Sequence, residues 1–345
     1  MTFDLRNVIS EPDESIDAAN ARLYAAGFTD GLPIVPPTHA RIDAMLRGRG
    51  ASEHIAELAP LMASATREAI ACCAVMAGCL PEYMPVLEAA VAAAGEPQFN
   101  LLGVQTTTGS AAVCIIVNGP VVERLGINYA GNALGPGVRA NAALGRALAL
   151  TLRNVGGAVP GELDMATLGQ PGKYTFCFAE NERENPWEPL HVTRGYTKED
   201  STITVFAAAG TMEVRDDCSS SADELLRTFA LSMTASGSAG TAGMLTGGEA
   251  LILLAPDHAA VIAKEKSRQE AQAALFETAQ LPASVLSRQM QKHLESSGIT
   301  EGTRLRVARS PDDILLMVVG GTGFKSAYIP SWGGGSRSVT KRIES

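Results

Sequence analysis

The chain lacks the patterns that mark several large classes of protein. No window approaches the ~18 uninterrupted apolar residues that a transmembrane helix needs, although 46% of the 345 residues are hydrophobic. Basic residues form no run or stripe of the kind that neutralises a phosphate backbone, and the formal net charge is -9. We therefore expect neither a membrane nor a nucleic acid as partner.

The motifs of the commonest enzyme designs are missing too. The sequence contains no HxH, HExxH or CxxC spacing, no GxSxG, and no GxGxxG followed by a suitable acid. This argues against the familiar zinc enzymes, serine hydrolases and dehydrogenases. Glutamates together with Asp200 and His191 could still build an oxygen-rich metal site with one imidazole. Because no metal-ligand spacing supports such a site, we predict no cofactor and assign no metal ligand.

Cysteine is present without any sign of pairing. Six thiols lie in apolar or loop surroundings, at Cys72, Cys73, Cys79, Cys114, Cys177 and Cys218. This usage is typical of a reducing compartment. The first residues, MTFDLRNVISEPDES, are acidic where a signal peptide would be basic and then apolar. We expect a cytoplasmic protein.

Aromatic residues are scarce, at 5%, whereas Ala and Gly are abundant. A core of small side chains favours closely packed helices and a well-buried sheet, and the length suits two lobes of roughly 150 residues. We predict an α/β protein with an N-terminal lobe over 1–160, which begins with a helical segment, and a C-terminal lobe over 161–345. The small-residue helices also favour a homo-oligomer.

Two segments suggest that the lobes are related. TGSAAVCIIVNGPVVERLG (108–126) and TGGEALILLAPDHAAVIAK (246–264) both run from Thr-Gly through an Ala into an apolar strand and then a Pro. The match predicts an internal repeat built from strand-turn-helix units, although such units are common in unrelated α/β proteins. Related lobes would leave a cleft between them, where ligands usually bind.

Residues 173–191, KYTFCFAENERENPWEPLH, concentrate polar side chains in an otherwise apolar chain. Lys173, Glu180, Glu182 and His191 are the ingredients of general acid and base catalysis, because a His titrates near neutrality and carboxylates orient it or tune a lysine. The alternative is a solvated loop anchored by Trp187. We predict that Lys173 and His191 move protons and that Glu180 tunes them.

The clearest helix, predicted over 138–155, opens with GNALGPGVRAN. We place its buried stripe at Val138, Ala142, Gly145, Leu148, Leu152 and Val155. Free backbone N–H groups at Gly135 and Gly137, with Arg139 as a fixed cation and Asn141 beside it, would hold a carboxylate or phosphate. The alternative is a Gly/Pro turn that only starts the helix.

Lys325 follows the glycines of VVGGTGFK and is a further candidate contact for an acidic substrate, with a structural hairpin as the alternative. The spacing does not fit a P-loop, because Phe324 separates the last Gly from the Lys. Two thiols could be reactive. Cys79 lies at a helix end, and Cys218 precedes a helix whose N-terminus would lower its pKa; the alternative for both is an inert side chain.

Five segments carry a resemblance to a known family: GLPIVPPT, AVMAGCLPEYMPV, GPGVRANAALGRALALTLRNVGG, GKYTFCFAENE and YIPSWGGGS. Through them the chain resembles, over nearly its whole length, an uncharacterised family of bacterial proteins. Some members are encoded beside small selenocysteine- or cysteine-containing proteins named for a UGSC motif. The resemblance implies a metabolic protein, with a thiol or selenol protein as partner, and it assigns no catalytic residue.

Taken together, these patterns predict an enzyme, a hydrolase or lyase, that acts on a small anionic substrate by acid and base chemistry. One alternative is a thiol-dependent redox component that uses Cys79 or Cys218. Another is a non-catalytic ligand-binding subunit. The enzymatic prediction requires residues 131–141 and 173–191 to line one cavity.

Overall fold

Two four-stranded sheets form the centre of the computed structural model, which describes residues 3–235, 245 and 247–344. In the order β12-β5-β3-β4, the first sheet contains Val339–Arg342, Thr202–Ala208, Ala112–Asn118 and Cys177–Ala179. In the order β10-β7-β11-β6, the second contains Ile314–Val318, Ala250–Leu254, Lys325–Pro330 and Met212–Arg215. The predicted α/β class is confirmed.

An apolar core joins the two sheets face to face. Ile116 and Phe206 of the first sheet are buried in one cluster with Leu253 and Met317 of the second. Because side chains alternate along a strand, the neighbouring Ile115 faces the other way, into the core shared with the helices. The inter-sheet space is therefore filled by side chains along most of its length.

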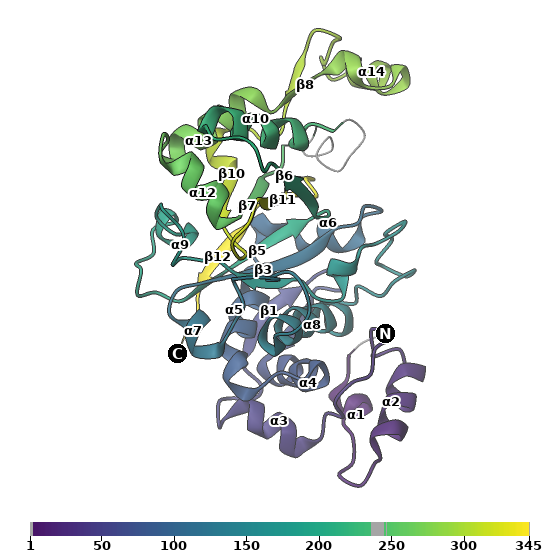
Figure 1. Cartoon of the computed structure of the whole chain (residues 1–345). Helices are drawn as coiled ribbons and strands as arrows, with labels where there is room; N and C mark the ends of the chain where they lie inside the picture. The colour runs from purple at the N-terminus through teal and green to yellow at the C-terminus, as the bar shows by residue number, and fades with distance from the viewer. Residues whose placement is uncertain (1–2, 236–244, 246, 345) are drawn as a thin grey trace.

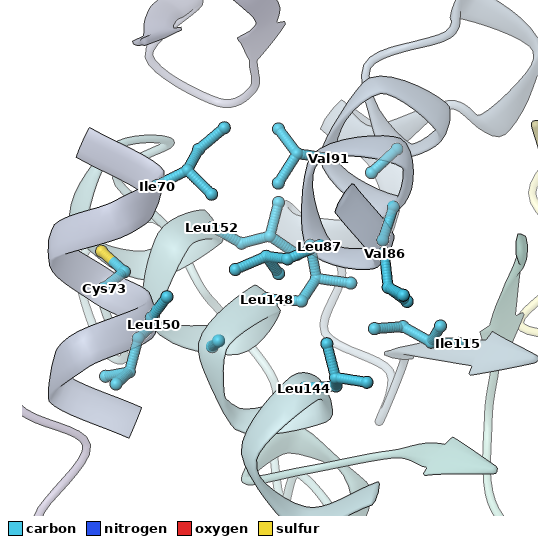
Figure 2. Close-up of a cluster of buried hydrophobic side chains, with 14 of the residues drawn as sticks. Ile70, Cys73, Val86, Leu87, Val91, Ile115, Leu144, Leu148, Leu150 and Leu152 are labelled. Atoms are coloured by element: carbon cyan, nitrogen blue, oxygen red, sulfur yellow. The ribbon is translucent and has the colours of Figure 1, made fainter. Parts of the chain in front are cut away.

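Helices cover the outer face of each sheet. The first sheet is covered by α5 (Met84–Ala94) and α8 (Arg139–Asn154), and α4 (Arg67–Ala77) packs on these two helices. Figure 2 shows Val86 of α5 and Leu144 of α8 near Ile115 of β3. The second sheet is covered by α10 (Ala222–Met233), α12 (Pro256–Ala263) and α13 (Arg268–Thr278). The layers therefore run helix, sheet, sheet, helix (Figure 1).

The central helix, α8, packs closely against the chain that leads into β4. A Cβ added to Gly145 would meet the Thr175 side chain and would lie 2.5 Å from the Phe176 nitrogen. The helix begins and ends almost as predicted, but its predicted stripe is wrong in part. Ala142 is exposed whereas Leu144 is buried, because α8 is packed both on the sheet and on α4 and α5.

The two sheets share one topology. In each, a strand is followed by a short and a longer helix, then by a parallel neighbour and an antiparallel strand: β3-α7-α8-β4-β5 and β7-α12-α13-β10-β11. The next strands are exchanged, since β6 pairs with β11 and β12 pairs with β5. The similar segments at 108–126 and 246–264, of which Thr246 lies outside the described residues, thus hold equivalent places.

The predicted boundary between the lobes needs correction. β4 and β5 follow the predicted boundary at 160/161 yet pair with β3, so that boundary cuts through the first sheet. Helix α4 begins at Arg67, directly after residues 63–66, which pair with β1 as strand β2. The apolar run before Thr107 is the helix α6, which Asn100 caps.

Further elements surround this frame. They are α1 (Leu5–Val8), α2 (Ile16–Ala25), α3 (His39–Leu46), β1 (His54–Leu58), β2 (Ala63–Thr66), α6 (Leu101–Thr106), α7 (Val121–Leu125), α9 (Leu190–Thr193), β8 (Gln280–Pro282), α14 (Arg288–Glu295) and β9 (Arg304–Arg306). Among the described residues, no helix combines the length and the apolar character needed to cross a membrane.

Candidate functional site

A row of buried polar side chains lies where β3 and β4 end. Asn118 and Glu180 follow paired positions of these parallel strands, and Thr202 opposes Asn118 at the start of β5. Strand alternation puts all three on the face turned toward the second sheet. The carboxyl ends of parallel strands are where open α/β sheets usually bind ligands.

Glu180 is held by N–H donors from three segments of the chain. Its Oε2 accepts hydrogen bonds from the Asn118 side chain at 2.6 Å and from the Leu190 backbone at 2.8 Å. Its Oε1 accepts one from the Asn185 side chain at 2.7 Å. Glu180 is 1% exposed, so these contacts fix the carboxyl group in one orientation.

Burial and hydrogen bonding act in opposite directions on this carboxyl group. Loss of water raises its pKa, while the nearby Arg268 and the N–H donors of Leu190 and Asn118 lower it, with a net rise to about 7. A carboxyl group poised between its two protonation states near neutral pH has the property that a general acid or base needs.

His191 and Glu182 complete the row. Glu182 accepts hydrogen bonds from the Asn118 side chain at 2.9 Å and from the Gly119 backbone at 2.8 Å. Its Oε1 lies 3.7 Å from Nδ1 of His191, which α9 carries at one side of the sheets (Figure 1). His191 is fully buried, and neither ring nitrogen has a hydrogen-bond partner within the described ranges.

A small cavity of about 210 Å³ opens beside this row, and we call it the polar pocket. It is lined by Gly119, Pro120, Val122, Glu123, Tyr129, Glu180, Glu182, Arg183 and Lys198. Glu180 and Glu182 therefore border space that a small molecule can enter, and two cations stand at the same cavity.

Lys173 lies elsewhere. It ends a short 3-10 turn before β4, and its ammonium group pairs with the Asp164 carboxylate at 2.7 Å. The extended chain from 174 to 180 moves Glu180 about 20 Å along the strand direction. Lys173 instead lines a larger cavity, of about 510 Å³, at the other end of β3. The predicted partnership of Lys173 with Glu180 and His191 is therefore wrong.

The glycine-flanked start of α8 is not part of either cavity. Asn141 is buried and binds the backbone, since its side chain accepts from the Asn128 N–H at 2.7 Å and donates to Asn128 and Cys177 carbonyls. Gly135 packs on the Asn132 side chain. Arg139 is exposed, and Gly137 has a φ of +125 that suits a turn.

Neither cavity is lined by both residues 131–141 and residues 173–191, so the two segments do not form the predicted common pocket. Both cavities are lined only by residues between Tyr24 and Lys198. Neither cavity is therefore the predicted binding cleft between lobes. The space between the two sheets is filled by their shared apolar core.

The remaining predicted residues are also apart. Cys79 donates to the Ala143 carbonyl at 3.4 Å, and burial raises its pKa to about 12, which disfavours a nucleophilic thiolate. Cys218 is exposed, ahead of α10, which Ser221 caps. Lys325 is exposed at the start of β11. None of the three lines either cavity.

Within the described residues, no group of three or more His, Cys, Asp or Glu side chains is placed to hold a metal ion. Comparison with protein-family models and with curated proteins found no match to this chain.

Several residues of these sites were not predicted, among them Arg183 and Lys198 of the polar pocket. Asn118 and Thr202 stand at strand ends, and Asp164 lies in a Gly/Pro-rich loop. Arg153 lines the larger cavity. Its spacing of seven from Arg146, which places both on one side of α8, was the available signal. An Asn at the end of an apolar strand was the signal for Asn118.

Proposed function

We propose that the protein is an enzyme that acts on a small anionic molecule by proton transfer in the polar pocket. The observation that carries this proposal is Glu180, a fully buried carboxyl group with a pKa near 7 that borders a cavity. Groups with such properties are concentrated at catalytic sites. Lys173, Gly135, Gly137 and Arg139 have no part in this assignment.

Each group of the pocket has a role that its contacts support. Arg183 and Lys198 line the cavity, and each has an exposed carboxylate partner, Glu123 at 2.9 Å and Glu188 at 3.5 Å. The anionic end of the substrate binds by taking the place of these exposed partners. Oε1 of Glu180 has one hydrogen bond, from Asn185, and Oε2 has two. Oε1 therefore has room for the transferred proton.

A lyase fits this pocket better than a hydrolase that uses a nucleophilic side chain. No Ser, Thr or Cys is among the residues that line it. Ionised Glu180 removes a proton from the carbon next to the substrate carboxylate, and the C–H electron pair expels a leaving group from the adjacent carbon. Glu182, which also lines the cavity, passes a proton to that group, and His191, which lies behind it with Nδ1 3.7 Å from Oε1 of Glu182, exchanges that proton with Glu182.

The test follows deuterium exchange at the α-carbon of a panel of small hydroxy- and amino-acids, measured by proton NMR in heavy water. Exchange on one member of the panel identifies the substrate class. The Glu180→Gln variant should lose the exchange at least 100-fold. The matched control is Glu184→Gln, which removes an exposed carboxylate of the same segment. Equal activity in wild type and Glu180→Gln would refute the role of Glu180.

The other predictions stay proposals. Within the redox alternative, the exposure of Cys218 favours this residue over Cys79 as the reactive thiol. The thiol or selenol protein partner rests on the family resemblance alone. We also propose a cytoplasmic location, which the six unpaired thiols support, and a homo-oligomer, which the small-residue helices support.

A further inference from the structure

The larger cavity has no role in the proposed reaction. It lies between α2, the second half of α8, the start of β3 and the loop of residues 158–174. Its volume of about 510 Å³ is in the range of pockets for small-molecule ligands. We propose that it is a second binding site, which takes a monocarboxylate with an apolar body.

Arg153 supplies the group that would bind the carboxylate. Its guanidinium donates one hydrogen bond, at 2.9 Å to the Gly27 carbonyl, and has no other hydrogen bond or ion pair within the described ranges. Two helical turns earlier, the Arg146 side chain donates hydrogen bonds to both carboxylate oxygens of Asp30, at 2.7 and 2.8 Å. Arg153 is thus a half-buried cation with N–H donors to spare, and a carboxylate matches two of them.

The charges around the cavity select the ligand. Asp30, Asp164, Arg153 and Lys173 line it, so the lining has two charges of each sign. Lys173 is already paired with Asp164, and Asp30 with Arg146. Asp30 and Glu162 also act electrostatically on Arg153. The site therefore favours one added negative charge, whereas a dianionic phosphate would add a second charge that faces carboxylates without a further cation.

The walls of the cavity indicate an apolar body. Three of the largest exposed apolar side chains of the protein line it: Tyr24, Tyr174 and Leu168, which are 67%, 50% and 95% exposed. Ala149 and Leu152 of α8 add further apolar surface. Grouped apolar side chains beside one polar anchor are typical of sites for amphipathic ligands.

The site is separate from the polar pocket. The larger cavity is lined by Ala112 and Val113, at the start of β3, and the polar pocket by Gly119, just after its end. Six residues of strand put these ends about 20 Å apart. Binding at Arg153 therefore does not depend on the proposed function of Glu180.

The test is isothermal titration calorimetry of the full chain with hexanoate and 3-phenylpropanoate. At least one should bind saturably, while hexanol, 3-phenylpropanol and hexyl phosphate should bind at least 10-fold more weakly. Arg153→Gln should weaken carboxylate binding at least 10-fold, because the ion pair is lost. The matched control Arg227→Gln removes an exposed cation on α10 and should bind as the wild type does.

A second variant keeps the test valid if loss of Arg153 disturbs folding. Ala149→Leu keeps every charge but fills part of the cavity, and it should also weaken binding. Glu180→Gln should leave binding unchanged, which separates this site from the proposed reaction. Failure of both carboxylates to bind, equal binding of the alcohols, or unchanged binding in both Arg153→Gln and Ala149→Leu would overturn the proposal.

Discussion

The carboxyl group of Glu180 makes stability depend on pH in a defined direction. Its pKa is about 7 in the folded chain, against 4.5 for the free side chain, because it is buried. The folded state therefore binds more protons than the unfolded state between these values. The stabilising contribution is complete below pH 4.5 and is lost as the pH rises through 7.

We predict that replacing this group removes that pH dependence. The free energy of unfolding, measured with urea, should be lower in Glu180→Gln than in wild type. This difference should be larger at pH 5 than at pH 8. The two differences should differ by about 2.5 kcal/mol, which is most of the free energy that corresponds to the pKa rise, because pH 5 already lies above the unfolded pKa. Glu184→Gln should give the same small difference at both pH values. A difference for Glu180→Gln that is constant between pH 5 and 8 would contradict the prediction.

At the scale of single elements, α8 depends on one glycine. Gly→Ala inside a helix normally stabilises by about 1 kcal/mol. At Gly145 the added Cβ would meet Thr175 and lie 2.5 Å from the Phe176 backbone, which cannot move aside cheaply. The clash therefore outweighs the gain in helix propensity.

We predict that Gly145→Ala lowers the free energy of unfolding by about 2 kcal/mol, a typical cost of overpacking a core. The control is Gly302→Ala, where the added Cβ meets nothing within 4 Å. Chemical denaturation followed by circular dichroism measures both variants. A Gly145→Ala variant as stable as the wild type would show that α8 does not need this close approach.

The helices and strands also show which features of the fold can be predicted from the sequence. Periodicity and turn residues predict helix α8 over 138–155, within a residue of its observed ends, and strands β3 and β7, because these are local signals. The contacts of α8 with α4 are not local, so its buried stripe could not be placed. Lys173 and Glu180 are close in sequence, yet the strand between them separates the two side chains. Nearness along the chain therefore misplaced the candidate site, whereas Glu180 and His191 do lie together.

At the scale of the whole molecule, the exchanged strands connect the two lobes, each of which is one four-stranded sheet with the helices that cover it. β6 follows β5 in the chain but completes the second sheet, and β12 follows β11 but completes the first. The antiparallel bridge between Ala208 and Ser331 lies where the two strands cross over. Sequence patterns predict the strands but not this exchange, because either sheet offers β6 and β12 an antiparallel edge.

This arrangement should make the molecule unfold in one step. Neither sheet keeps four strands if the other unfolds, and the core between them is shared. The two tryptophans report on the two lobes separately, since Trp187 packs against the core of the second sheet and Trp332 against that of the first. Urea unfolding of Trp332→Phe and Trp187→Phe, each with one fluorophore left, should follow the same cooperative curve as circular dichroism for that variant. In either variant, a fluorescence midpoint separated from its circular dichroism midpoint would mean that the lobes unfold independently, despite the exchanged strands.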